Sequence, residues 1–180
     1  MFSQLVALDE RLSRHLAQLA ETRPLLRRSA SVLAHSGDSP IWVSGLLLVV
    51  WLGSAFWRVT AQADLVGIAI TALVVQAIKW RVRRPRPPGH WGQGYRRLDP
   101  HSFPSGHAAR AVMLATLAVL LGPLWWALGL IIWSLLVSVA RVVLRVHYLS
   151  DVIVGGVCGL ICGVALGIAV NSGLQIDLLI

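Results

Sequence analysis

The sequence of 180 residues has little charge and almost no cysteine. Only 13% of its residues are charged, whereas 56% are hydrophobic and the mean hydropathy is +0.70. Soluble domains carry about 25% charged residues, so this composition excludes an ordinary soluble fold and indicates an integral membrane protein. The two cysteines, Cys158 and Cys162, lie four residues apart within an apolar stretch. This pattern is neither a disulfide framework nor a cysteine metal site.

Among the few charged residues, acidic ones are the minority. The chain has eight Asp and Glu against sixteen Lys and Arg, and its net charge is +8. Such a balance fits either a nucleic-acid partner or an anionic membrane surface. Most of the arginines, however, lie beside apolar stretches rather than in a soluble segment. We therefore expect no nucleic-acid partner and predict that the cations meet the bilayer and a lipid phosphate. The oligomeric state stays open.

A helix needs about 20 residues to cross a bilayer. Five apolar stretches approach this length, the third being short: 41–57, 63–80, 108–121, 124–140 and 152–170. We predict an all-α integral membrane bundle of five transmembrane helices, or six if the N-terminal region holds another buried segment. Residues 1–40 mix apolar and charged positions at a helical period, so we assign them to an amphipathic N-terminal surface segment. Residues 41–180 form the membrane-embedded domain.

Four glycines repeat every four residues in the last stretch: Gly155, Gly159, Gly163 and Gly167. A stripe of small residues predicts close packing against a neighbouring helix.

The number of apolar stretches decides on which side of the membrane each connecting segment lies. With five crossings, the segments 79–110 and 141–151 lie on the same side of the membrane as the N-terminus. Three polar clusters within these segments should therefore meet at one end of the bundle.

The first polar cluster, KWRVRRPRP at 79–87, puts five cations at the end of the second stretch. Snorkelling arginines that contact lipid headgroups explain many such runs. The alternative is a phosphate clamp, because the planar fork of arginine matches phosphate oxygens and lysine adds a compact charge. Within this run, Arg83 and Arg84 are expected to be solvated or to contact headgroups.

The second cluster, FPSGHAAR at 103–110, comes directly before the third stretch. Ser105 is a good N-cap, and Gly106 lets the backbone approach a ligand closely. The free N–H groups of a helix N-terminus bind anions. The plain alternative is an ordinary capped helix with an incidental histidine at 107.

The third cluster, ARVVLRVHYLSD at 140–151, joins the fourth and fifth stretches. His147 and Asp151 are four residues apart, so in a helix the carboxylate would hold the imidazole N–H and fix its tautomer. The plain alternative is a structural histidine at the membrane edge. Since ionisable residues at this depth are functional candidates, the convergence of three clusters favours a functional site.

Taken in order, the three clusters resemble the tripartite signature of the type-2 phosphatidic acid phosphatase superfamily. The matching residues are Lys79, Arg86, Pro87, Pro104, Ser105, Gly106, His107, Arg141, His147 and Asp151. Three motifs in the right order with the family's internal spacing are highly specific. One position departs, because the third motif usually opens with Ser-Arg and Ala140 stands here for the serine. One accessory hydroxyl is therefore missing.

This resemblance implies a membrane phosphatase that needs no metal and no cofactor and works through a phosphohistidine. His147 would attack phosphorus, and Asp151 would orient its ring. His107 would protonate the leaving oxygen and later activate water. The remaining motif groups would surround the phosphate oxygens: Lys79, Arg86, Ser105, Gly106 and Arg141.

A site at the end of membrane helices favours a phosphate carried by a lipid. Polyprenyl phosphate or diphosphate, phosphatidylglycerol phosphate, phosphatidate and a phosphorylated lipid-linked sugar all fit. A lipid phosphotransferase would use the same residues. A vanadate-dependent haloperoxidase shares the signature but is disfavoured by the membrane-embedded composition. A non-catalytic lipid-binding protein is disfavoured because both motif histidines and Asp151 are present.

We predict a multi-pass protein of the plasma membrane. On the predicted topology, every Lys and Arg except Arg58 lies on the side of the three motifs. The positive-inside rule then favours a cytoplasmic site, whereas the resemblance favours the outer face, where the family more often works.

Overall fold

The computed structural model describes residues 2–89 and 93–173, and these residues fold almost entirely into α-helices. The prediction of an all-α membrane bundle is confirmed, and the part of the chain described has no β-structure beyond one isolated bridge between Pro85 and His101. The helices are α1 (Phe2–Glu21), α2 (Pro24–Ser36), α3 (Ser39–Leu52), α4 (Ala55–Val82), α5 (Gln93–Leu98), α6 (Gly106–Leu121), α7 (Leu124–Val143) and α8 (Leu149–Asn171).

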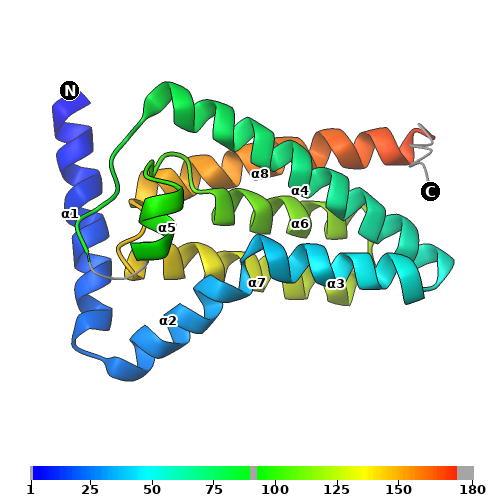
Figure 1. Cartoon of the computed structure of the whole chain (residues 1–180), viewed down its shortest axis with the longest axis horizontal. Helices are drawn as coiled ribbons and strands as arrows, with labels where there is room; N and C mark the ends of the chain where they lie inside the picture. Colours follow the sequence, from blue (N-terminus) through cyan, green and yellow to red (C-terminus); the bar gives the residue numbers. More distant parts are fainter. Residues whose placement is uncertain (1, 90–92, 174–180) are drawn as a thin grey trace.

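Helices α3, α4, α6, α7 and α8 run along one common axis, and α1 lies across one end of them (Figure 1). By length and composition, α4, α7 and α8 can each cross a membrane. The pair α2 and α3 passes the same criterion together, with a bend of 50° between the two helices. The apolar helix α6 is shorter, at 16 residues. The chain is thus a multi-pass membrane protein.

The first two predicted stretches have different boundaries in the structure. The stretch 41–57 was expected to be one helix, but α3 ends at Leu52 and α4 already begins at Ala55. Gly53 and Ser54 between them have extended backbone angles, which break the helix without interrupting the apolar sequence. As a result α4 has 28 residues, or about 42 Å at 1.5 Å per residue. It reaches far enough to carry Lys79 at its last turn.

Helix α6 lies at the centre of the bundle, packed against α4, α7 and α8. The predicted glycine stripe of α8 faces it, which confirms the expectation of close helix packing. A Cβ atom at Gly159 would overlap the carbonyl oxygen of Ala109, and one at Gly155 would lie 2.5 Å from the carbonyl oxygen of Ser105. Because only hydrogen fits at these positions, α8 brings Asp151 directly behind the first turn of α6.

The N-terminal helices pack against the end of the bundle that holds the polar clusters (Figure 1). Helix α2 contributes Ala30 and Ala34 to an apolar cluster with Ala140 and Leu144 at the end of α7. Helix α1 buries Ser13 and Ala17 while leaving several leucines of its other face exposed. This amphipathic pattern agrees with the predicted surface helix, but its buried face contacts the site described below.

Candidate active site

Three segments that are distant in the sequence meet at one end of the bundle. They are the last turn of α4 with the loop after it, the first turn of α6, and the loop between α7 and α8. Together they border a cavity of about 220 Å³. Of the eight residues predicted for the site, six line this cavity: Lys79, Arg86, Gly106, His107, Arg141 and His147. The other two, Ser105 and Asp151, are fully buried directly behind it.

His147 lies in the short loop between α7 and α8, and the backbone of Arg141 fixes this loop. The carbonyl oxygen of Arg141 accepts hydrogen bonds from the backbone N–H groups of Val146, at 3.1 Å, and of His147, at 3.2 Å. Arg145 adopts a left-handed conformation with φ of 55°, which is uncommon for a residue with a side chain. This turn directs His147 back towards the cavity.

The hydrogen bonds of the His147 ring differ from those expected. Its Nδ1 is 2.7 Å from the carbonyl oxygen of Ser102, whereas the nearest oxygen of Asp151 is 3.6 Å away. Asp151 therefore does not hold the imidazole N–H through a hydrogen bond. The reason is that α8 begins at Leu149, so His147 precedes the helix and the helical spacing does not apply. Sequence reasoning missed Ser102, since a backbone carbonyl has no signal of its own.

The environment of His147 favours its neutral form. Its side chain is almost fully buried, and burial is the main reason that the pKa of His147 lies well below its ordinary value. The positive charges of Arg141, Arg86 and Lys79 act in the same direction. Since Nδ1 donates to the Ser102 carbonyl, the lone pair of a neutral ring resides on Nε2. The guanidinium of Arg86 donates to that nitrogen at 3.1 Å.

Two of the predicted phosphate ligands share an acidic partner, Asp99. The carboxylate of Asp99 accepts a hydrogen bond from Arg86 at 2.9 Å and is also paired with the ammonium of Lys79. The backbone carbonyl of Asp99 accepts a further bond from Arg86 Nε at 2.8 Å. Asp99 was not selected from the sequence, because it lies outside the three motifs.

The first turn of α6 has the capped geometry expected for it. Ser105 is the N-cap, and its hydroxyl accepts from the backbone N–H of Ala108 at 3.4 Å. The backbone N–H of Ser105 donates to the carbonyl of Asp151 at 2.9 Å, which ties α6 to α8. A Cβ atom at Gly106 would meet only Val75, at 3.7 Å. Gly106 therefore leaves open space at the helix N-terminus, where the cavity lies.

The ring of His107 points its Nε2 at the carboxylate of Asp38, 2.7 Å away. Asp38 lies in the turn between α2 and α3. Asp38 occupies the N-cap position of α3 without a side-chain capping bond. Its acceptance of a hydrogen bond from the motif histidine was not predicted.

Arg84 is not solvated as expected, because it joins α1 to the third cluster. Its guanidinium donates to Asp151 at 2.8 Å and to Asp9 of α1 at 2.9 Å. Asp9 also accepts from the backbone N–H of Ser150 at 3.0 Å, and the hydroxyl of Ser13 accepts from that of Leu149 at 2.9 Å. Helix α1 therefore caps the N-terminus of the helix that carries Asp151.

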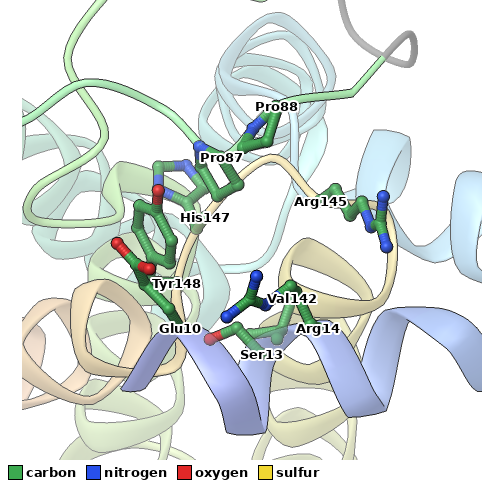
Figure 2. Close-up of a pocket in the computed structure, with 9 residues that line it drawn as sticks. All are labelled: Glu10, Ser13, Arg14, Pro87, Pro88, Val142, Arg145, His147 and Tyr148. Atoms are coloured by element: carbon green, nitrogen blue, oxygen red, sulfur yellow. The ribbon is translucent and has the colours of Figure 1, made fainter. Parts of the chain in front are cut away.

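A second cavity, of about 160 Å³, borders His147 on the side of α1. In Figure 2, Glu10, Ser13 and Arg14 of α1 line one wall, and His147 lies across the cavity beside Pro87. His147 thus lines both cavities. The hydrogen bonds that fix its loop keep it between the two spaces.

The departure from the family's third motif has a structural explanation. Ala140 is almost fully buried and packs in the apolar cluster that α7 shares with Ala30 and Ala34 of α2. A serine hydroxyl at this position would have to find a hydrogen-bond partner in an apolar environment. The alanine therefore suits the packing of α2 against α7.

The residues of the cavity suit an anion. Lysine and arginine carry donors only, and four such cations, Arg110 among them, line the cavity together with the N-terminus of α6. Within residues 2–89 and 93–173, no three His, Cys, Asp or Glu side chains come together as a metal site would require. A tetrahedral oxyanion such as phosphate matches both the charge and the donors.

Comparison with known proteins agrees with the fold and the motifs. Residues 60–172, more than half of the chain, match the model of the PAP2 superfamily. LpxE from Aquifex aeolicus is similar in structure, with a TM-score of 0.71 and 24% identity over 87% of this chain and 92% of that one. A transmembrane PAP2-type phosphatidylglycerolphosphate phosphatase from Bacillus subtilis has a TM-score of 0.79 and 20% identity over 97% of this chain and 90% of that one. The match to the family model spans all three polar clusters, and this chain belongs to the PAP2 superfamily.

Proposed function

We propose that this protein is a membrane lipid phosphatase that hydrolyses a phosphate monoester or diphosphate of a lipid through a phosphohistidine on His147. One observation carries the proposal. Both motif histidines and four cations, Lys79, Arg86, Arg110 and Arg141, line a single cavity, and the same cavity is walled by apolar residues of α4. Membership of the PAP2 superfamily supports a phosphatase, and the multi-pass fold supports a lipid substrate.

The nucleophile in this proposal is Nε2 of His147. The lone pair of the ring lies on Nε2 because Nδ1 is bonded to the Ser102 carbonyl and the lowered pKa keeps the ring neutral. The hydrogen bond that Nε2 accepts from Arg86 must break before it attacks phosphorus. Arg86, 3.1 Å from Nε2, places a guanidinium where the oxygens of an attacked phosphate would lie. Donors aimed at the developing charge supply much of the rate enhancement in such sites.

The chemical steps balance with the residues present. Nε2 of His147 forms a bond to phosphorus while the bond from phosphorus to the lipid oxygen breaks, and His107, which acts here as the imidazolium, gives that oxygen a proton and becomes neutral. Water then attacks the phosphohistidine, and His107 takes a proton from it. Inorganic phosphate leaves, and both histidines return to their starting forms. Lys79, Arg86 and Arg141 offset the negative charge throughout.

The lipid class follows from the wall of the cavity. Part of the cavity wall is apolar and comes from α4, which contributes Ile68, Ala72 and Val75. Helix α4 is a membrane-spanning candidate. An acyl or prenyl chain could remain among apolar side chains while its phosphate reaches His147. Phosphatidate, phosphatidylglycerol phosphate, polyprenyl phosphates and diphosphates, and phosphorylated lipid-linked sugars all have this form.

The test is phosphate release by the purified full-length protein in detergent over a panel of these lipids. We expect at least one lipid to release inorganic phosphate with water as the only acceptor, which a phosphotransferase would not do. The His147→Ala variant should release none while eluting as the same folded species. Turnover by His147→Ala at the wild-type rate would refute the mechanism, and a silent panel would favour a non-catalytic lipid-binding protein.

A further inference from the structure

The turn between α2 and α3 contacts the active site although it lies outside the residues matched to the family. The match begins at residue 60, whereas this turn is formed by Gly37 and Asp38. We propose that Asp38 positions His107 for proton transfer, so that the N-terminal region is a working part of the site. This inference rests on the proposed phosphatase function and adds a residue to it.

The geometry of Asp38 is that of an orienting carboxylate. Its Oδ1 is 2.7 Å from Nε2 of His107, and its Oδ2 is 3.0 Å from Nδ1 of His35. A carboxylate accepts only, so Nε2 of His107 is the protonated nitrogen of the neutral ring. In the imidazolium, the form that the general-acid step requires, Nδ1 carries the second proton, and this is the proton exchanged with the substrate. One hydrogen bond thereby sets both the tautomer and the direction of the ring.

The turn that carries Asp38 is anchored on both sides. The indole N–H of Trp42 donates to the carbonyl of Ser36, and the indole N–H of Trp133 donates to its hydroxyl, each at 2.9 Å. On the other side, the guanidinium of Arg110 donates to the hydroxyl of Ser39. A carboxylate on a fixed turn can hold a ring in one orientation, which a mobile surface residue could not do.

Gly37 allows the turn to approach the ring itself. A Cβ atom at this position would lie 3.1 Å from Cδ2 of His107 and equally close to Val137. The φ of Gly37 is −89°, an ordinary value, so close approach is the reason for a glycine here. The His107 ring is therefore confined between its own helix and the turn.

The charges around His107 give the carboxylate a second task. Burial of the His107 ring disfavours its imidazolium form, and the positive charges of Arg141 on α7 and Arg110 on α6 act in the same direction. A general acid must carry its proton when the bond to the leaving oxygen breaks. The carboxylate of Asp38, at hydrogen-bond distance, favours the imidazolium and thus opposes these effects in part.

The test compares Asp38→Asn with wild type on two substrates. The first is phosphatidate or phosphatidylglycerol phosphate, whichever the wild type cleaves faster, whose alkoxide leaving group needs a proton. The second is p-nitrophenyl phosphate, whose phenolate leaves without one. We expect kcat/KM, which reports the steps up to departure of the leaving group and excludes the hydrolysis of the phosphohistidine that both substrates share, to fall about 10²-fold on the lipid, within the usual range for general acid catalysis. On the aryl phosphate we expect a loss of less than about 10-fold.

Three further variants separate positioning from folding. His107→Ala should give the same dependence on the leaving group, and the double variant Asp38→Asn with His107→Ala should lose no more than His107→Ala alone, because coupled residues are not additive. Glu21→Gln removes a carboxylate that pairs with Arg145 at 3.3 Å on the exposed face of α1. This control should leave both substrates unaffected.

Equal losses on the two substrates, or additive losses in the double variant, would overturn the role of Asp38. So would an Asp38→Asn enzyme with wild-type kcat/KM on the lipid. These results differ from a failure of the proposed function, in which the wild type itself would release no phosphate or would not depend on His147.

Discussion

The ammonium of Lys79 is paired with the carboxylate of Asp99 inside the cavity, where the proposed substrate phosphate would lie. The same carboxylate accepts a hydrogen bond from Arg86 at 2.9 Å. Lys79 and Arg86 have buried side chains, whereas that of Asp99 is 36% exposed. The two buried cations are thus neutralised in part by a side chain that can swing out towards solvent.

The pairing predicts how inorganic phosphate inhibits the enzyme. Phosphate must displace the carboxylate of Asp99 to reach Lys79 and Arg86. Asp99→Asn should therefore lower the phosphate concentration that gives half-inhibition by about 3- to 10-fold, where a factor of ten corresponds to about 1.4 kcal/mol of binding free energy. The measurement is hydrolysis of p-nitrophenyl phosphate against added phosphate. The Asp99→Glu variant keeps the negative charge, so phosphate should inhibit it at the same concentration as wild type. Weaker inhibition of Asp99→Asn would mean that Asp99 organises the cations instead of competing for them.

The contact between α1 and α8 should depend on pH. Burial alone would raise the pKa of Asp9, but hydrogen bonds from Ser150 and Arg84 outweigh it and lower that pKa below its ordinary value of 3.8. A carboxyl with a lowered pKa in the folded state adds stability above its ordinary pKa, and this stability is lost as the pH falls through the lowered value. Helix α1 should therefore be held above pH 3.8 and released progressively below it.

Hydrogen–deuterium exchange of the α1 amides, corrected for intrinsic rates, would measure this release. Protection in α1 should be high at about pH 5 and reduced at about pH 3, while the core helix α6 stays protected at both. In Asp9→Asn the protection of α1 should be low at both values, because the titrating group is gone. Unchanged protection of wild-type α1 across this range would show that the Asp9 contacts do not hold the helix.

The packing of α8 predicts a contrast between a glycine of the stripe, Gly159, and a glycine outside it, Gly156, three residues away. A Cβ atom at Gly159 would overlap backbone of α6, whereas one at Gly156 would meet only Val112, at 3.6 Å. Gly159→Ala should lower the free energy of unfolding by about 1–3 kcal/mol, the usual cost of overpacking a core. Gly156→Ala should be neutral or slightly stabilising, because alanine favours a helix. Thermal unfolding in one detergent would compare them, and equal melting temperatures would contradict this packing.

Hydropathy predicted the apolar helices but not all of their ends. The break at Gly53 and Ser54 lies inside a continuous apolar run, and a hydropathy average does not register a change of backbone angle. The glycine stripe was predictable, because its spacing of four residues is itself a helical repeat. The pairing of His147 with Asp151 was expected at hydrogen-bond distance and found at 3.6 Å. The spacing argument assumed a helix that includes His147, whereas α8 begins two residues later, at Leu149.

The residues that complete the site belong to none of the three motifs. Asp38, Asp99 and Ser102 each contact a motif residue, yet they lie in turns and loops that have no period and no recognisable spacing. Asp9 lies more than 140 residues before Asp151, and Arg84 bonds to both. Nothing in the local sequence around these residues indicates such partners.

The sequence by itself determined that this chain is helical and membrane-embedded, that α8 packs closely, and which residues carry the family motifs. These properties depend on composition, helical periodicity and short spacing, all of which are local. Only the tertiary structure decided which carbonyl fixes the His147 tautomer and which carboxylate faces His107. It also decided which carboxylate pairs with Lys79 and Arg86. Those contacts form between segments that the fold brings together, and their partners are set by helix packing and turn geometry, which no single stretch of sequence encodes.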